Sequence, residues 1–246
     1  MPFYVLKLGG SLMATSRELV RALLSLGAGN EKGPDGDGYS FLVVPGGGPM
    51  ADLVREIYSR EGLSQEAAHW MAVLAMEQYA RFLADGTGAA LTTEIVRPGR
   101  GEGSVEEEHL RILLPYQALL RDDFSIEHNW DFTSDAVAAL VAARLSAPLI
   151  KATDVDGIFL EDENFERYGK EDAAKPGPYG ARGGRRTLPE ISAARLMGVE
   201  SCLDQGTVRL LCGRLKGSSI WILNGSDPDG FICSLKRGEG GTVVKG

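Results

Sequence analysis

The 246-residue sequence has few residues that bind metals or form disulfides, with only three cysteines and three histidines. The cysteines include no Cys-x-x-Cys pair and the histidines no His-Glu-x-x-His pattern, so no metal-ligating residues are predicted. Basic residues are also in the minority, with 26 Lys and Arg against 34 Asp and Glu, a net charge of −8. This balance excludes the basic surface that nucleic-acid binding requires.

Long apolar runs are absent as well. No stretch of 18 apolar residues occurs, and the N-terminus has no basic segment followed by a long apolar one, as a secretory signal would. We therefore expect a cytoplasmic protein without a membrane partner. Hydrophobic residues make up 43% of the chain and charged residues 24%, which is typical of a globular protein. At this length, one large domain or two small ones fits.

Short apolar runs alternate with longer helical patterns, which indicates an α/β fold with helices on both faces of a sheet. Because several runs are apolar throughout, the sheet is predicted to be mostly parallel. The predicted strands are Phe3–Leu8, Phe41–Val44, Ala89–Thr93, Arg111–Leu114, Pro148–Ala152, Ser219–Leu223 and Thr242–Lys245. Spacings near three and four predict helices over Arg17–Leu26, Pro49–Arg60, Ser64–Ala84, Ser134–Leu145 and Gly206–Leu215. The third helix is predicted to place Ala67, Met71, Leu74, Gln78 and Phe82 on one face, with Ala75 and Tyr79 beside it.

Two segments lack this periodicity. Gly27–Ser40 is rich in turn-forming residues and predicts a surface hairpin or loop. Glu161–Thr187 is charged, contains many Gly and Pro residues, and gathers the basic residues Lys175, Arg182, Arg185 and Arg186. A basic loop is usually only solvated, but arginines there could also bind a phosphate.

Two strands run directly into glycines ahead of a helix. The first is followed by Gly9, Gly10 and Ser11, with Lys7 just before them; the second leads into Gly46–Gly48 and Pro49. Glycines let backbone N–H groups approach phosphate oxygens closely, and a helix N-terminus adds partial positive charge. Two such loops at the carboxyl edge of a parallel sheet favour an anion-binding site. Neither loop has the spacing of a Walker A or a dinucleotide-binding motif.

Two further runs carry acidic residues. Asp131 and Asp135 flank Thr133 and Ser134, which are candidates for the N-cap of a helix. If the helix has begun by Asp131, the two carboxylates share a face; if it begins later, Asp131 lies in the loop and Asp135 in the first turn. Their roles could be capping, holding Lys7 or binding Mg²⁺. The other run, 151–159, ends a strand with an Asp156-Gly157 turn.

In this order, the four runs resemble the amino acid kinase superfamily, whose members carry Lys-x-Gly-Gly-Ser, Gly-Gly-Gly, an Asp-bearing helix start and Thr-Asp-Val-Asp-Gly. The match spans nearly the whole chain. It implies that residues 1–246 form a single domain, a three-layer α/β/α sandwich with an acceptor-binding part at about 1–145 and a nucleotide-binding part at about 146–246. It also implies transfer of the γ-phosphoryl group of ATP, with Mg²⁺, and assembly into a homo-oligomer.

The resemblance also implies roles for single residues. The catalytic residues would be Lys7, Asp135 and Asp131, with Lys7 neutralising charge on the transferring phosphoryl group. The ATP-binding residues would be Gly9, Gly10, Ser11, Thr153, Asp154, Asp156, Gly157 and Phe159. The acceptor-binding residues would be Gly46, Gly47, Gly48, His128, Thr133 and Ser134. This division suits phosphoryl transfer, in which a protein mainly positions anions and stabilises spread charge.

Finer similarities lie in residues 67–76, 113–116 and 130–135, which resemble the archaeal branch of methanofuran biosynthesis. That branch phosphorylates aminomethylfuran-methyl phosphate to its diphosphate, which implies a small phosphorylated acceptor. His69 and Trp70 lie on a predicted long helix and are expected to pack rather than to contact substrate. His128 is the better candidate for an acceptor contact.

The position of a second active-site lysine is left open. Gln205 stands where a basic residue is expected, and Lys151, Arg185 or Arg209 could substitute. Two alternatives to the furan phosphate kinase therefore remain: a uridylate- or acetylglutamate-type kinase, and a nucleotide-dependent binding or storage protein of the same fold. A hydride-transferring Rossmann enzyme is excluded because its glycine fingerprint is missing.

Overall fold

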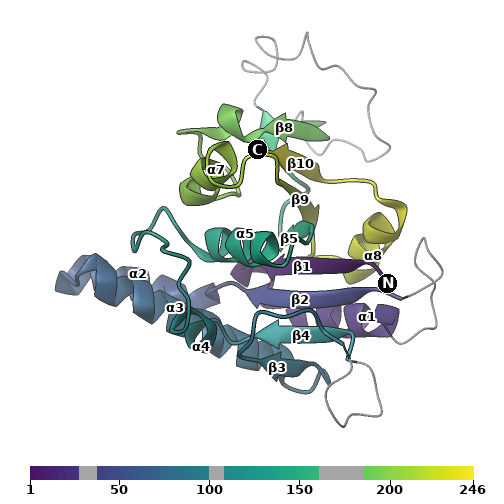
Figure 1. Cartoon of the computed structure of the whole chain (residues 1–246), viewed down its shortest axis with the longest axis horizontal. Coiled ribbons are helices and arrows are strands. Elements are labelled where there is room, and N and C mark those ends of the chain that lie inside the picture. The colour runs from purple at the N-terminus through teal and green to yellow at the C-terminus, as the bar shows by residue number, and fades with distance from the viewer. Residues whose placement is uncertain (28–37, 100–107, 161–185) are drawn as a thin grey trace.

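The computed structural model describes residues 1–27, 38–99, 108–160 and 186–246, and within them eight strands form one sheet (Figure 1). Its order is β3-β4-β2-β1-β5-β9-β10-β8. The strands are β1 (Phe3–Leu8), β2 (Ser40–Pro45), β3 (Ala90–Thr92), β4 (Leu110–Leu113), β5 (Leu149–Thr153), β8 (Glu190–Ser192), β9 (Ser219–Asn224) and β10 (Thr242–Lys245). The first six in the sheet order are parallel, whereas β10 is antiparallel to β9 and parallel to β8.

All seven predicted strands lie in this sheet, each within one residue of its expected bounds, and the mostly parallel three-layer α/β prediction is confirmed. Strand β8 and the short pair β6 (Phe159–Leu160) and β7 (Arg186–Thr187) were not predicted. They are only two or three residues long, so they carry no periodic pattern. Most of the two irregular segments, at 28–37 and 161–185, lies outside the described residues, as do Lys175, Arg182 and Arg185.

The helices are α1 (Ser16–Gly27), α2 (Gly48–Glu61), α3 (Gln65–Ala84), α4 (Pro115–Leu119), α5 (Ser134–Arg144), α7 (Gln205–Cys212) and α8 (Pro228–Arg237). The five predicted helices are among them. Helices α4 and α8 were not predicted, although α8 has clear end signals: Pro228 in its first turn and Gly238 in the left-handed conformation after its last. No helix in the described ranges is long and apolar enough to cross a membrane.

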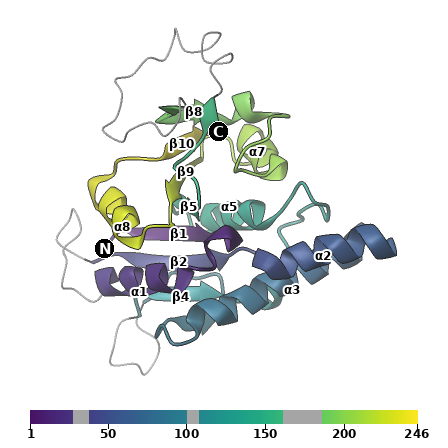
Figure 2. The same ribbon diagram turned by 180° about the vertical axis from the view of Figure 1, so that it is seen from behind.

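Two hydrophobic cores cover the two faces of the sheet because strand side chains alternate in direction. In β1, Val5 belongs to the core beneath α5 and α7, whereas Leu6 and Leu8 belong to the core beneath α1 and α8. Figure 1 shows α5 on one face, and Figure 2 shows α1 on the other. The sheet is thus the middle layer of an α/β/α sandwich.

The predicted face of α3 is not its core face. The helix packs through Val73, Met76, Ala80 and Leu83, whereas Leu74 is 40% exposed. Leu74, Met71 and Gln78 instead line a shallow apolar groove between α2 and α3. Helix α3 is covered on two sides, by the sheet and by α2, so its apolar residues surround more of the helix than one stripe.

The carboxyl ends of the central strands carry the loops of interest. Strands β2, β1 and β5 are neighbours, and their register places Lys7 directly opposite Lys151. Helices α2 and α3 extend beyond this edge of the sheet, away from the end at which the N-terminus lies (Figure 1). This edge is the one at which open α/β sheets bind ligands.

Candidate active site

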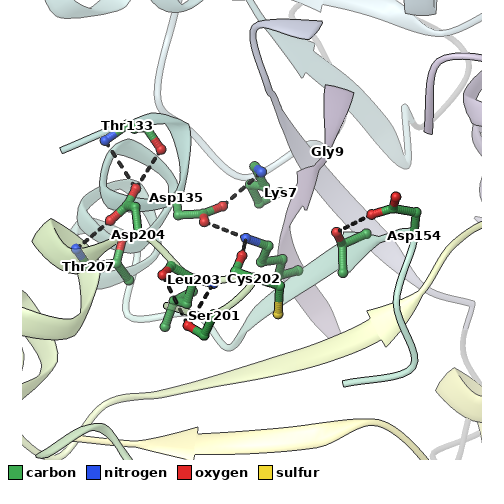
Figure 3. A network of polar contacts seen from close by, with 12 residues as sticks. Lys7, Gly9, Thr133, Asp135, Asp154, Ser201, Cys202, Leu203, Asp204 and Thr207 are labelled. Atoms are coloured by element: carbon green, nitrogen blue, oxygen red, sulfur yellow. Dashed lines mark hydrogen bonds and ion pairs between the residues drawn. The ribbon is translucent and has the colours of Figure 1, made fainter. Parts of the chain in front are cut away.

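Asp135 lies between two lysine ammonium groups. Lys7 Nζ is 2.8 Å from Asp135 Oδ1, and Lys151 Nζ donates to Asp135 Oδ2 and to the backbone carbonyl oxygen of Cys202. Figure 3 shows Lys7 directed at Asp135. The three side chains are 9%, 5% and 6% exposed for Lys7, Lys151 and Asp135. Two cations and one anion are therefore buried together at the carboxyl edge.

Strand parity explains why both lysines face the same carboxylate. Lys7 and Lys151 are registered partners on adjacent parallel strands, so their side chains leave the sheet on the same face. That face is covered by α5, which begins at Ser134 and so places Asp135 in its first turn. The positive end of the helix dipole further favours a carboxylate there.

Burial and charge act in opposite directions on this cluster. Burial raises the pKa of Asp135, but the charges of Lys151 and Lys7 outweigh it and hold that pKa well below its usual range. Burial lowers the pKa of Lys7, and the nearby Asp135 opposes this lowering. The cluster keeps one positive charge in excess when all three groups are ionised, and this suits an adjacent phosphate.

The two glycine loops touch each other beside Lys7. Gly9 N donates to Ala152 O over 2.9 Å, and Gly46 N donates to Leu8 O over 2.8 Å, so each loop is fixed to a neighbouring strand end. A Cβ on Gly10 would lie 2.3 Å from the Cα of Gly48. Only glycine fits at this contact, because any side chain on Gly10 would force the loops apart.

A cavity of about 680 Å³ opens from these loops. Eight of the predicted site residues line it: Lys7, Gly10, Ser11, Gly46, Gly47, Gly48, Thr133 and Ser134. The other walls come from α2, α3, α5 and the 129–132 segment, and they combine apolar side chains with polar ones such as Arg55 and His69. An anion-binding end and an apolar body are suited to a small phosphorylated molecule.

Five of the predicted ATP-binding residues, from Thr153 at the end of β5 to Phe159 in β6, are not among the residues that line this cavity. Thr153 Oγ1 donates to Asp154 Oδ1 over 3.2 Å, and Asn224 Nδ2 donates to Asp156 Oδ1 over 2.7 Å. Gly157 has φ +142°, and a Cβ there would lie 2.4 Å from Thr242 Oγ1. Phe159 follows in β6, where it pairs with β7. The structure thus separates these residues from the predicted acceptor residues.

Asp131 and His128, two further predicted site residues, also do not line the cavity. Asp131 is not among the residues that line it; its carboxylate is 55% exposed and lies 2.7 Å from Arg209 Nη2. The later helix start leaves Asp131 in the loop, the second of the two arrangements considered from the sequence. His128 lies behind His69, with its ring stacked on that of His69 at 3.9 Å, and only His69 lines the cavity. This reverses the order of preference expected from the sequence.

Asp204, which was not predicted as a site residue, joins α7 to the start of α5. It accepts hydrogen bonds from Thr133 N, Thr133 Oγ1 and Thr207 N, at 3.0, 2.5 and 2.6 Å (Figure 3). Thr133 therefore occupies the N-cap position of α5 but gives its hydroxyl to Asp204. Burial raises the pKa of Asp204, and the charge of Asp135 adds to this.

Gln205, at the position where a basic residue was expected, binds the backbone instead. Its amide donates to Leu196 O and Val199 O and accepts from Gly198 N, so it binds a backbone turn away from Lys7. Arg209, another alternative, pairs with Asp131. Among the described candidates, Lys151 is the one that reaches the cluster. Its signal in the sequence was its position near the end of a buried strand, equivalent to that of Lys7.

Comparison with known proteins identifies the protein family. Residues 2–176 match the model of the amino acid kinase family, so the chain belongs to that family. It is 31% identical, over 157 residues, to the [5-(aminomethyl)furan-3-yl]methyl phosphate kinase of Methanocaldococcus jannaschii. The aligned region covers 63% of this chain and 68% of that protein.

Solved structures share the fold at lower identity. Uridylate kinase from Archaeoglobus fulgidus matches with a TM-score of 0.63 and 21% identity, covering 98% of this chain and 99% of the other. The isopentenyl phosphate kinase of T. acidophilum, in a product complex, matches with a TM-score of 0.54 and 18% identity, covering 99% and 100%. These likenesses concern the fold.

Proposed function

We propose that this protein transfers the γ-phosphoryl group of ATP to [5-(aminomethyl)furan-3-yl]methyl phosphate and so forms the diphosphate. The support for the acceptor is the 31% identical relative of that name. The observation that carries the reaction type is the buried Asp135 between Lys7 and Lys151, next to two touching glycine loops. Such a site concentrates positive charge where two phosphates must meet.

In the proposed reaction, a phosphate oxygen of the acceptor attacks the γ-phosphorus of ATP. The bond from that phosphorus to the β,γ-bridging oxygen breaks, and ADP leaves with the electron pair. Lys7 neutralises the charge on the moving group, while Asp135 and Lys151 keep Lys7 in position. Gly9, Gly10 and Ser11 hold the ATP phosphates, and Gly46–Gly48 with Thr133 and Ser134 hold the acceptor. The nucleotide residues are Thr153, Asp154, Asp156, Gly157 and Phe159.

We assign no residue of the described chain as a resident metal ligand. No group of three or more His, Cys, Asp or Glu that could hold a metal occurs in the described ranges, and both oxygens of Asp135 contact lysines. Mg²⁺ commonly binds through substrate phosphates and water with only one or two carboxylates. We therefore propose that Mg²⁺ enters on ATP, where it would neutralise phosphate charge.

The alternatives are less well supported. The uridylate and isopentenyl phosphate kinases share only the fold at about 20% identity. The storage protein was suggested by a missing second lysine, and Lys151 now supplies a second ammonium group in the cluster. We retain the division into an acceptor part, about 1–145, and a nucleotide part, about 146–246, as a proposal, together with the cytoplasmic location.

The test is ADP release from Mg·ATP with the furan phosphate, UMP and acetylglutamate offered in parallel. We expect selective turnover of the furan phosphate, and formation of its diphosphate can be followed by ³¹P NMR. Preferential turnover of UMP or acetylglutamate would contradict the acceptor and retain the kinase. Tight ATP binding without any turnover would favour the storage protein. Lys7→Ala provides the blank, since it removes the charge at the reacting phosphate.

We also propose a homo-oligomer that uses the groove between α2 and α3. Leu53 and Leu74, 56% and 40% exposed, lie on its rim, and Ile57 lines it. Light scattering after size exclusion should give a multiple of the 26.4 kDa chain. The variant Leu53→Lys should lower that mass, whereas Leu120→Lys, at an equally exposed leucine outside the groove, should not. A monomeric parent protein would contradict this proposal.

A further inference from the structure

His69 on α3 lines the cavity and has a buried ring nitrogen that is unpaired in the described part of the chain. The residue is 8% exposed and lines the cavity, and its Nε2 is buried with no hydrogen-bond partner among the described residues. Leaving a buried polar atom unpaired costs about 1–3 kcal/mol. Buried polar groups without a protein partner call for a specific explanation, and a ligand is one.

Neighbouring side chains fix this ring from behind. The ring of His128 stacks on it with centroids 3.9 Å apart and planes 9° apart. His128 Nδ1 pairs with Glu66, and its Nε2 lies 3.6 Å from Asp123 Oδ2. Trp70 Nε1 also donates to Glu66, over 2.7 Å. These contacts hold the ring of His69 in a packed layer of side chains.

The environment keeps His69 uncharged. Burial and the adjacent His128 lower the pKa of His69 to about 4, although Glu66 and Asp123 oppose this. A neutral imidazole has one nitrogen that accepts a hydrogen bond and does not repel a cation. The carboxylates of Glu66 and Asp123 lie beside the adjacent His128. An ammonium group satisfies both features, because it donates hydrogen bonds and is attracted by the carboxylates.

Along α3, His69 lies away from the glycine loop that we propose holds the ATP phosphates. Tyr79, on the same helix, donates its hydroxyl to Gly9 O over 3.3 Å, so that part of α3 lies at the first glycine loop. His69 is ten residues earlier, which is about 15 Å along the helix axis. Between them, Val73 and Met76 line the cavity with apolar surface. An anion site, an apolar wall and a cation site thus follow one another.

We propose that neutral His69 accepts a hydrogen bond from the ammonium group of the acceptor and so selects aminomethyl substrates. This inference rests on the proposed function, because the furan phosphate carries its aminomethyl group and its phosphate on opposite sides of one ring. His69 is then a specificity residue that contacts the part of the acceptor remote from the transferred phosphoryl group.

The test compares two acceptors and two matched variants. The acceptors are the aminomethylfuran phosphate and its analogue with methyl in place of aminomethyl. The variants are His69→Phe, which keeps an aromatic ring, and the control Trp70→Phe, which perturbs the same layer without removing a residue that lines the cavity. Each is assayed for kcat/KM by ADP release, after circular dichroism has established folding.

We expect His69→Phe to lower kcat/KM for the aminomethyl acceptor about 10- to 100-fold, as for a hydrogen bond to a charged group. For the methyl analogue the change in kcat/KM should stay within about threefold. Trp70→Phe should change kcat/KM for both acceptors by the same factor. His69→Asn, whose amide oxygen can accept, should recover part of the loss; this variant also serves if His69→Phe does not fold.

Several results would overturn the inference. An equal loss on both acceptors would make His69 a packing residue, as would full activity of His69→Phe on the aminomethyl acceptor. Equal use of both acceptors by the parent protein would show that the ammonium is not selected, while leaving the kinase intact. Absence of turnover of either furan phosphate by the parent protein would instead reject the proposed function itself, and the inference with it.

Discussion

Two aspartates four residues apart, Asp135 and Asp131, occupy opposite environments at the carboxyl edge. Asp135 is 6% exposed and lies between Lys7 and Lys151, whereas Asp131 is 55% exposed and pairs with Arg209 at 2.7 Å. Both belong to the same short run of sequence, and both are ion-paired. Their difference is burial, because α5 begins between them and carries only Asp135 into the layer beneath the sheet.

Burial changes what an ion pair does. Coulomb attraction between exposed charges is weakened by water, so such pairs contribute little to stability. A buried group has no water to replace a lost partner, and its charge state depends on its neighbours. We therefore expect the cluster around Asp135 to determine both stability and chemistry, and the pair around Asp131 to fix only a loop.

The largest expected contrast is in kcat, between variants of Lys7 and of Arg209. Lys7→Met should lower kcat by about 100- to 1,000-fold, as expected for the loss of one preorganised group that stabilises charge in the transition state. Arg209→Met should change kcat by less than about fivefold, because Arg209 is 43% exposed and pairs only with Asp131 among the described carboxylates. Initial rates of ADP release measure both. Similar losses in the two variants would show that the exposed pair also serves the reaction.

Replacing the carboxylates tests the same contrast through stability. Asp135→Asn leaves two buried ammonium groups without a counter-charge, and we expect it to lower the free energy of unfolding by about 3–5 kcal/mol. Asp131→Asn should cost no more than about 1 kcal/mol. Urea titration at pH 7, followed by tryptophan fluorescence, gives both values. Equal costs would mean that burial does not separate the two sites.

The pH dependence of stability extends the comparison to histidine. The pKa of His69 falls from 6.5 to about 4 on folding. As the pH is lowered, His69 is therefore protonated in the unfolded chain at a higher pH than in the folded protein. Stability should therefore fall as the pH drops from 6.5 to 4, by at most about 3 kcal/mol from this group. Asp135 acts in a separate window, because its lowered pKa removes stability only as the pH falls below its usual 3.8.

The variant His69→Phe isolates this effect. It cannot bind the proton, so its free energy of unfolding should decrease less than that of the parent protein between pH 6.5 and pH 4. The measurement is urea unfolding at half-unit pH steps. Parallel pH curves for the two proteins would show that His69 is not held neutral by burial.

A smaller effect than at Lys7 or Asp135 is expected at the link between α7 and α5. Thr133→Val removes the hydroxyl that donates to Asp204 and leaves that carboxylate with two backbone donors, Thr133 N and Thr207 N. We expect a loss of about 1–2 kcal/mol and a fall in kcat of less than tenfold. In a double-mutant cycle with Asp204→Asn, the two losses should not add, because they share one hydrogen bond. Additive losses would show that the two side chains act independently.

Much of the fold could be predicted from local patterns. The strands of the parallel core are apolar throughout, and the glycine loops follow β1 and β2 directly, so their common location at one edge followed from the parallel arrangement. Elements of two to five residues, such as β8 and α4, escaped prediction because so few residues show no periodicity. The core face of α3 was assigned wrongly because α2 covers a second side of that helix.

The sequence by itself determined the strand ends, the two glycine loops and the presence of Lys7 and Asp135 beside them, because periodicity and turn chemistry are local. Only the tertiary structure decided which charges meet. Lys151 joins Asp135 through the register of β1 with β5, Gln205 is bound to a backbone turn, and His69 rather than His128 reaches the cavity. The first and the last of these outcomes depend on contacts between segments far apart in the sequence, and a charge or a hydrogen bond has its effect only once burial has fixed its partner.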